Sequence, residues 1–251
     1  SLVDRIVPGN PDISTKNEIE KLIRSQDHLI TVTETYKLWA IECSEKVKGI
    51  ISFAQSDEGV VLTDNLDMYR ELKLRLLNGT HSLICGAAML YGKHTVKEAM
   101  DDQLLAAFIK ELVLNELVKS LPDNIDEKVA VDFASNVMER FSNPFIHHHW
   151  LNIATNATQK MSVRVIPMFI RYVEKFNAVP DYLTTCFAAY LLFMKPVRAE
   201  KGIYYGNCNE TEYIINDSNA AYFYSAWKNK KIPQFVHDVL SNSALWHTDL
   251  T

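Results

Sequence analysis

The chain has 251 residues, of which 47% are hydrophobic, and a net charge of -5 at neutral pH. This length allows a substantial buried core, and the charge gives no indication of a nucleic-acid partner or an anionic membrane. Four cysteines lie scattered without Cys-x-x-Cys spacing, which favours reduced thiols in the cytoplasm over disulfides or a zinc site. The longest nearly apolar run, residues 183–194, is too short to cross a bilayer.

The first part of the chain is predicted to contain one short helix and a small antiparallel β element. An apolar stripe over residues 12–26, with Ser14 or Thr15 as the cap, predicts the helix. β-Branched and aromatic residues then predict two or three short strands. The strands are expected at residues 28–33, 36–43 and 59–63. Residues 44–57 show no clear pattern, so their structure stays open.

From residue 64 onward, hydrophobic residues recur at helical spacing. Helices are expected at residues 64–91, 96–100, 102–120, 126–141, 146–157, 158–176, 182–194, 217–227 and 231–240. Pro122 closes one helix and Pro167 kinks another, because proline removes a helical hydrogen bond. Residues 197–216 are polar and are predicted to form a loop. The fold is therefore predicted to be mainly α, with an N-terminal segment, 1–63, and a multi-helical domain, 64–251.

The first of these helices carries three groups suited to alcohol and carbonyl chemistry. On an α-helix, Asn78 lies about 140° and His81 about 80° from Lys73, so the three share roughly one side. Leucine and isoleucine fill much of the remaining surface, which predicts a helix buried nearly all round. In one interpretation all three are structural: a lysine stem along the core, a helix bend and a core histidine. In the other, a buried lysine acts as a general base and the amide and imidazole donate hydrogen bonds to the reacting oxygen.

A second candidate cluster follows Arg140, which either complements a helix C-terminus or binds a ligand. The three adjacent histidines at residues 147–149 point in different directions on a helix, so they do not form a metal site by themselves. Asn156, Lys160 and Arg164 recur at intervals of four. They form either a solvated face or the wall of an anion pocket.

Three short segments resemble those of one family, in the same order. The run KLRLLNGTHS carries a Lys-x4-Asn-x2-His signature at Lys73, Asn78 and His81, and the segments at residues 4–8 and 140–144 read DRIVP and RFSNP. The chain resembles the polyol-specific long-chain dehydrogenases, the mannitol dehydrogenase family. Within this family, the sequence is most similar to members that interconvert altronate and tagaturonate with NAD.

The resemblance implies a helical substrate domain and a role for five residues. Lys73 is expected to act as the general base, and Asn78 and His81 are expected to polarise the substrate oxygen. Arg140 and His148 are expected to bind the substrate, a small sugar acid. No metal is expected, because a lysine and two neutral donors supply what a zinc ion would supply.

In this family the DRIVP segment follows a dinucleotide-binding domain, and the sequence contains no GxGxxG turn. We therefore expect this chain to be the C-terminal part of a longer enzyme, inactive without an N-terminal Rossmann domain that holds NAD. Fructuronate and mannitol are the alternative substrates. The alternative from another class is a helical scaffold or binding domain without chemistry.

Overall fold

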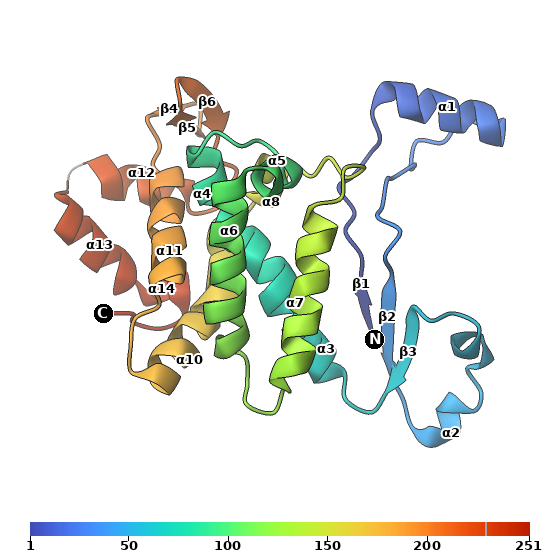
Figure 1. Ribbon diagram of the computed structural model, residues 1–251. Helices are drawn as coiled ribbons and strands as arrows, with labels where there is room; N and C mark the ends of the chain where they lie inside the picture. The colour runs from blue at the N-terminus through green and yellow to red at the C-terminus, as the bar shows by residue number, and fades with distance from the viewer. Residues whose placement is uncertain (229) are drawn as a thin grey trace.

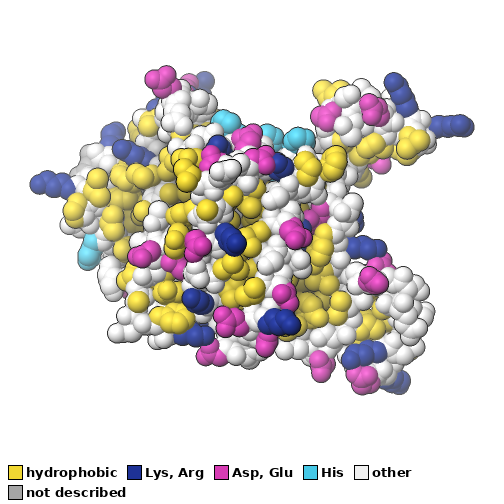
Figure 2. Space-filling model, viewed as in Figure 1, with side chains coloured by type: hydrophobic (Ala, Val, Ile, Leu, Met, Phe, Trp, Pro, Cys, Tyr) yellow, Lys and Arg dark blue, Asp and Glu magenta, His cyan; other side chains and the backbone are white. Residues whose placement is uncertain are grey.

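The structure is a computed structural model and describes residues 1–228 and 230–251. Its body is a group of packed helices, with an N-terminal segment and its small sheet against one side (Figure 1). Two lobes protrude from that segment, formed by α1 (Ile13–Ile23) and by the region around α2 (Glu45–Lys48) (Figure 2). The chain is mainly helical with minor β structure, as predicted. Within the described ranges, no helix combines the length and the apolarity that crossing a bilayer requires.

The N-terminal sheet is of mixed direction. It consists of β1 (Leu2–Asp4), β2 (Leu38–Glu42) and β3 (Val60–Thr63), in that order. β1, for which no strand was predicted, pairs antiparallel with β2, whereas the predicted strands β2 and β3 pair parallel with each other and not antiparallel. The second pairing differs because residues 44–57 form α2 and a 3₁₀ turn (Ser52–Gln55), which make a crossover connection of the kind that parallel strands need.

The strand predicted at residues 28–33 is wrong. These residues are extended or turned and make only one isolated bridge, between Val32 and Gly9. The helix before them is confirmed, but its cap is Asp12, whose side chain accepts from the backbone N–H of Thr15 at 2.9 Å. No residue of α1 is buried, so this helix stands away from the body (Figure 1).

The helical body follows the predicted order closely. Its α-helices are α3 (Leu66–Leu72), α4 (Thr80–Leu90), α5 (Val96–Asp101), α6 (Gln103–Glu111), α7 (Glu127–Phe141), α8 (Trp150–Ile153), α9 (Ala157–Lys160), α10 (Ile166–Phe176), α11 (Asp181–Phe193), α12 (Ala220–Lys228), α13 (Ile232–Leu240) and α14 (Ser243–Trp246). Three of the long predicted helices each contain a π-helical stretch. These are η2 (Lys73–Gly79), η3 (Leu112–Leu117), which runs into the 3₁₀ turn η4 (Val118–Ser120), and η5 (Met161–Val165).

The helix α4 lies at the centre of the body and packs closely along α11. A Cβ atom at Gly86 would lie 3.0 Å from the Tyr190 Cα and 3.1 Å from its backbone nitrogen. Only glycine allows two helix backbones to approach this closely without a shift. The π stretch η2 therefore continues directly into a helix most of whose residues are buried.

Residues 197–216 are not a loop. They form a three-stranded antiparallel sheet of β4 (Arg198–Glu200), β5 (Ile203–Cys208) and β6 (Thr211–Ile214). Each connection has two central residues at positive φ, such as Lys201 at 50° and Gly202 at 80°, which suits a tight hairpin. The sheet is mostly solvent-facing, so its strands lack the apolar alternation by which strands are predicted.

The helix predicted at residues 146–157 is wrong over most of its length, because only Trp150–Ile153 and the last residue, Ala157, are helical. At the start of this helix the backbone hydrogen bonds go to residues 94 and 95 and not to a preceding helical turn. The Trp150 N–H donates to the His94 carbonyl at 3.0 Å, and His149 forms a β-bridge with Thr95. Asn156, at a φ of 52°, then separates α8 from α9. This irregular stretch carries His148 to the side of α4.

Candidate active site

The π stretch η2 contains both Lys73 and Asn78. Backbone hydrogen bonds in a π-helix join residues five apart, so Asn78 lies about one turn beyond Lys73. His81 follows three residues later, and residues at that spacing are neighbours on a helix. That the three side chains share one side stays a prediction, and the π-helical spacing favours it, because an α-helix would separate the first two by about 140°.

The two stretches η2 and η5 are braced against each other by two arginines. Arg75, which is 6% exposed, donates through Nη1 to the backbone carbonyls of Val163 and Arg164 at 2.7 and 3.0 Å. In return, Arg164 donates to the Asn78 carbonyl at 3.4 Å and to the Ser82 hydroxyl at 3.1 Å. These bonds satisfy carbonyl groups in the two irregular stretches and hold Arg164 next to the signature residues.

His81 is a buried, neutral imidazole. Its ring stacks on Phe141 at 4.2 Å between centroids and meets the edge of His148 at 5.1 Å. Its Nε2 atom has no hydrogen-bond partner within the described residues. Burial first, and then the nearby His148 and Arg164, lower the pKa of His81 well below its ordinary value. A neutral imidazole with an unused nitrogen is suited to a hydrogen bond with an uncharged substrate oxygen.

Two further buried polar atoms beside His81 lack partners in the part of the chain that the structure describes: Nδ1 of His148 and Nε1 of Trp150. The Trp150 ring lies 6.2 Å from the His81 ring. Burial, with smaller contributions from His149 and Lys160, lowers the pKa of His148 to about 4. Buried polar atoms are usually satisfied, so three unsatisfied ones in one place are suited to hydrogen bonds with a polar ligand.

Two cations line the same region without a carboxylate partner. Lys160 donates to the Ile153 carbonyl at 2.8 Å, and the Arg164 side chain makes the two bonds described above. Neither forms an ion pair within residues 1–228 and 230–251. Burial lowers the pKa of Lys160, with repulsion from Arg164 adding to the effect, and burial also lowers the pKa of Arg164. Of the stripe predicted from the spacing, Lys160 and Arg164 are therefore partly buried, whereas Asn156 is exposed.

Lys73 is only partly buried, in contrast to the helix around it. Its amine donates to the backbone carbonyl of Val3 in β1 at 2.5 Å. It makes no hydrogen bond to Asn78 or His81 among the residues that the structure describes. The structure thus brings Asn78 and His81 together with the second cluster and holds Lys73 at the edge of that region, against the N-terminal strand.

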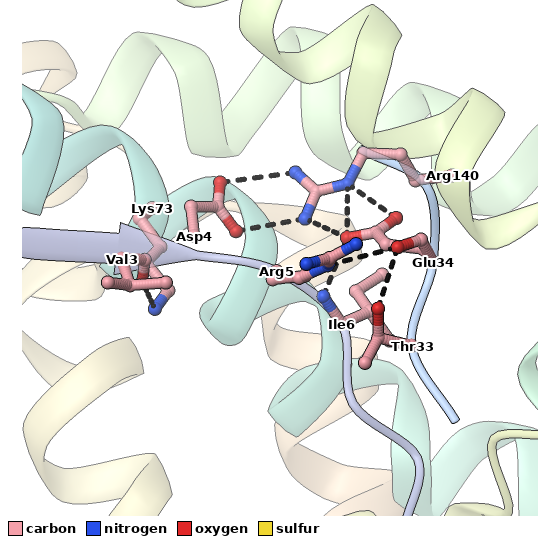
Figure 3. A network of polar contacts seen from close by, with 8 residues as sticks. All are labelled: Val3, Asp4, Arg5, Ile6, Thr33, Glu34, Lys73 and Arg140. Atoms are coloured by element: carbon pink, nitrogen blue, oxygen red, sulfur yellow. Dashed lines mark hydrogen bonds and ion pairs between the residues drawn. The ribbon is translucent and has the colours of Figure 1, made fainter. Parts of the chain in front are cut away.

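Arg140 is buried in a network of carboxylates (Figure 3). Its guanidinium donates to Asp4 at 2.9 and 3.1 Å and to Glu34 at 2.7 to 3.2 Å, so Nε, Nη1 and Nη2 all have partners. The Tyr36 ring covers one face at 4.1 Å. Burial alone would lower the pKa of Arg140, but the bonds from Asp4 and Glu34 outweigh it and raise the pKa, so the group stays charged. Its role in substrate binding stays a prediction.

Sequence reasoning did not assign a role to three of these residues. Asp4 belongs to the DRIVP segment, so its motif was a usable signal. Trp150 follows the histidine run and Glu34 lies in an unpatterned stretch, and no spacing links either of them to residues 73–81. Only the folded chain brings these positions together.

A helical body with a Lys, Asn and His signature on one π-interrupted helix defines the class of protein. Residues 65–251 match the family described as the mannitol dehydrogenase C-terminal domain, and the chain belongs to this family. Within the described part of the chain, no group of three or more His, Cys, Asp or Glu side chains is arranged to hold a metal ion.

Two relatives that the chain matches along its whole length are altronate oxidoreductases. The chain is 34% identical to the altronate oxidoreductase of Halalkalibacterium halodurans, over 100% of the chain and 50% of that protein. It is 32% identical to the altronate oxidoreductase of Bacillus subtilis, over 100% of the chain and 49% of that protein. The chain therefore spans about half the length of these relatives.

Two solved structures share the fold. One is Pseudomonas fluorescens mannitol 2-dehydrogenase in a ternary complex with NAD and D-mannitol, with a TM-score of 0.75 and 22% identity over 98% of this chain and 46% of that one. The other is D-sorbitol dehydrogenase in substrate-free form, with a TM-score of 0.62 and 20% identity over 100% of this chain and 53% of that one.

Proposed function

We propose that this chain is the substrate-binding part of an NAD-dependent tagaturonate reductase, which interconverts altronate and tagaturonate. The observation that carries the proposal is a cluster around His81 of neutral donors and of cations that form no ion pair with any described residue. The chain that holds it is 34% identical along its whole length to an altronate oxidoreductase. The remaining half of the relatives' length supports a second, nucleotide-binding domain in the whole protein. Four free thiols support a cytoplasmic setting.

In this mechanism Lys73 transfers the proton. In the direction of reduction it donates a proton to the oxygen of the ketone, and in the direction of oxidation it takes the proton from the alcohol. The bond from its amine to the Val3 carbonyl fixes the end of a flexible side chain. The remaining two N–H positions of the ammonium group are then free for the substrate.

Asn78 and His81 stabilise the oxygen as its charge develops. Both are uncharged donors on the same side of the helix as Lys73, and His81 is kept neutral by burial and by the surrounding cations. Preorganised donors of this kind are typically worth about 3 kcal/mol each in the activation barrier.

The nicotinamide, when bound, supplies the hydride for reduction and accepts it in oxidation. The residues around His81 fit a reaction of this kind, because an unused imidazole nitrogen and a lysine amine provide the oxygen and proton chemistry that hydride transfer to a ketone requires. We assign no residue of this chain to dinucleotide binding.

Lys160 and Arg164 support a sugar acid rather than a neutral polyol as the substrate. Both are partly buried and have no carboxylate partner within the described ranges, and a charge in that state is costly unless it is paired. A substrate carboxylate provides the missing partner, and an arginine can bind it through two parallel hydrogen bonds. His148, which is neutral, lies beside them as a further hydrogen-bonding group.

The test compares NADH oxidation by the full-length protein with tagaturonate, fructuronate and fructose. We expect the highest kcat/KM with tagaturonate. In the Arg164→Gln variant, kcat/KM for tagaturonate should fall by at least tenfold while that for fructose changes less than threefold. Arg198→Gln, which removes a surface arginine paired with Glu212, is the matched control. A preference for fructuronate or fructose would assign another reaction of the family, and no turnover with any of the three would contradict the proposal.

A further inference from the structure

Trp150 carries a buried hydrogen-bond donor that the fold does not use. The side chain is 1% exposed, and its Nε1 atom has no hydrogen-bond partner in residues 1–228 and 230–251. Trp246 lies equally deep, at 2% exposed, but its Nε1 atom donates to the Val239 carbonyl at 2.7 Å. Because buried donors are usually satisfied in native proteins, the indole of Trp150 is suited to an acceptor that a ligand brings.

The indole of Trp150 reaches back along α4 toward the signature histidine. Its backbone carbonyl accepts from the Cys85 thiol at 3.2 Å, and its backbone N–H donates to the His94 carbonyl at 3.0 Å. Cys85 lies one turn beyond His81 on α4, and His94 lies after the end of that helix. The indole ring nevertheless lies 6.2 Å from the His81 ring. The side chain therefore extends from its backbone into the candidate site.

The charged side chains that reach the same region are also donors. Lys160 holds its amine against α8, where it donates to the Ile153 carbonyl at 2.8 Å, one turn after Trp150. Arg164 holds its guanidinium against α4, where it donates to the Ser82 hydroxyl at 3.1 Å. Neither cation forms an ion pair with a described residue. An indole N–H, an ammonium group and a guanidinium group can donate hydrogen bonds but cannot accept them.

We propose that Trp150 is a specificity-determining residue, whose indole N–H donates to the carboxylate of the substrate beside Lys160 and Arg164. The inference rests on the proposed function, which supplies a sugar acid as the substrate. An ionised carboxylate only accepts hydrogen bonds, and its two oxygens offer about four lone-pair sites, so it can accept from three donors at once. A hydroxyl has a proton of its own to place, and these three groups offer it no acceptor.

An uncharged donor suits this position better than a further cation. Burial first, and then repulsion from Arg164, already lower the pKa of Lys160. A third positive charge would add to that repulsion, whereas an indole N–H does not. The indole still makes a charge-assisted hydrogen bond when the acceptor is a carboxylate. Trp150 therefore contributes to the preference for an anion without weakening the charge on its neighbours.

The first test observes the indole directly. The chain has four tryptophans, so ¹⁵N-tryptophan labelling of the full-length protein gives few indole resonances from this half. Trp→Phe variants at positions 39, 227 and 246 assign three of them, and the assignment of Trp150 does not then depend on a variant at that buried position.

The probe is altronate in the presence of NADH, a combination that cannot react, with mannitol and NADH as the uncharged comparison. We expect the Trp150 indole resonance to move downfield with altronate and to stay near its free position with mannitol. The Trp246 resonance should not move with either, because its donor is already bonded within the fold. A Trp150 resonance that altronate leaves in place, or that both compounds move equally, would overturn the proposal.

The second test is kinetic. In the full-length Trp150→Phe variant, KM for tagaturonate should rise about tenfold, the usual effect of losing one hydrogen bond to a charged group. We expect kcat to stay within threefold, because the carboxylate is bound alike in ground state and transition state. KM for fructose should change less than threefold. Trp227→Phe is the matched control, since its Nε1 atom is also buried without a described partner but its ring stacks on Phe235, at 3.8 Å between centroids.

The outcomes separate this role from the proposed function. If the wild-type protein prefers fructose to tagaturonate, the proposed function fails and the role of Trp150 fails with it. If the wild type prefers tagaturonate but Trp150→Phe raises KM for tagaturonate and fructose equally, or for neither, the role of Trp150 alone is wrong.

Discussion

The residues of the candidate site keep an imidazole neutral in a cluster of positive charge. His81 is 6% exposed, and two arginines and a lysine contribute to the lowering of its pKa after burial and His148. A neutral imidazole can donate one hydrogen bond and accept another, whereas a protonated one would repel the same cations. The site therefore combines positive charge with an uncharged donor, which is what the proposed anionic substrate and its reacting oxygen would require.

Lys73 provides the first prediction at this scale. In the full-length protein, Lys73→Ala should lower kcat by about 10²- to 10⁴-fold, the usual contribution of a general acid or base. Lys97→Ala, which removes a surface lysine from its pair with Asp101, should leave turnover unchanged. Steady-state NADH oxidation with tagaturonate measures both, and turnover of Lys73→Ala within threefold of wild type would end the assignment.

His148 provides a prediction about pH. Its pKa is lowered from 6.5 to about 4 in the folded protein, so between these values the unfolded chain binds a proton that the folded chain does not. The free energy of unfolding should therefore decrease as the pH falls through this window, by up to about 1.4 kcal/mol per pH unit for one group, and the contribution is complete above about pH 6.5. The pKa of His81 is also lowered by folding, so this residue likewise makes the free energy of unfolding decrease as the pH falls.

The measurement is urea unfolding at several pH values from 4 to 7.5. His148→Gln should lose less free energy of unfolding than the wild type on acidification, because it has no proton to bind in this range. His237→Gln, at a largely exposed histidine, should follow the wild type. Equal losses in all three proteins would contradict the burial of His148 as a neutral group.

At the scale of elements, the sequence predicts the long helices but not the π-helical stretches inside them. A helical period over residues 64–91 is strong because leucines fill its buried sides, so the helix and its signature residues could be found from sequence alone. The π turn changes only the angles between residues, which a hydrophobic period cannot resolve. The small surface sheet at residues 198–214 was missed for a related reason: its strands bury little apolar surface, so solvent exposure hides their period.

The contact between α4 and α11 predicts how the addition of a single Cβ atom at Gly86 changes the stability of the protein. In Gly86→Ala, the new Cβ would meet the Tyr190 Cα at 3.0 Å and must push the two backbones apart. Overpacking of this kind typically costs about 1 to 3 kcal/mol of unfolding free energy. Gly49→Ala is the matched control, because its nearest neighbour would be the Lys46 carbonyl at 3.7 Å.

Chemical denaturation measures both glycine variants. Gly49→Ala should be neutral or gain up to about 1 kcal/mol, since alanine reduces the freedom of the unfolded chain. A Gly86→Ala protein as stable as the wild type would mean that α4 and α11 are further apart than the structure has them.

At the scale of the whole molecule, one buried ionic network joins the N-terminal segment to the helical body. Asp4 and Glu34 belong to the segment and Arg140 to α7, and these side chains are 0%, 2% and 7% exposed. The partners are 106 and 136 residues apart in sequence, so no local pattern could have paired them. The network fixes the segment against the body next to Lys73.

Removing the arginine alone should therefore destabilise the molecule more than replacing all three charged side chains of the network by neutral ones. Arg140→Met leaves two buried carboxylates without their ion-pair partner and should cost about 3 to 5 kcal/mol. Adding Asp4→Asn and Glu34→Gln removes both charges and should recover at least half of that loss. Hydrogen exchange should locate the effect: in Arg140→Met, amides of β1 and β2 should exchange faster while those of α11 keep their protection. A single variant that costs less than 1 kcal/mol, or a triple variant no more stable than the single one, would show that the network does not hold the segment in place.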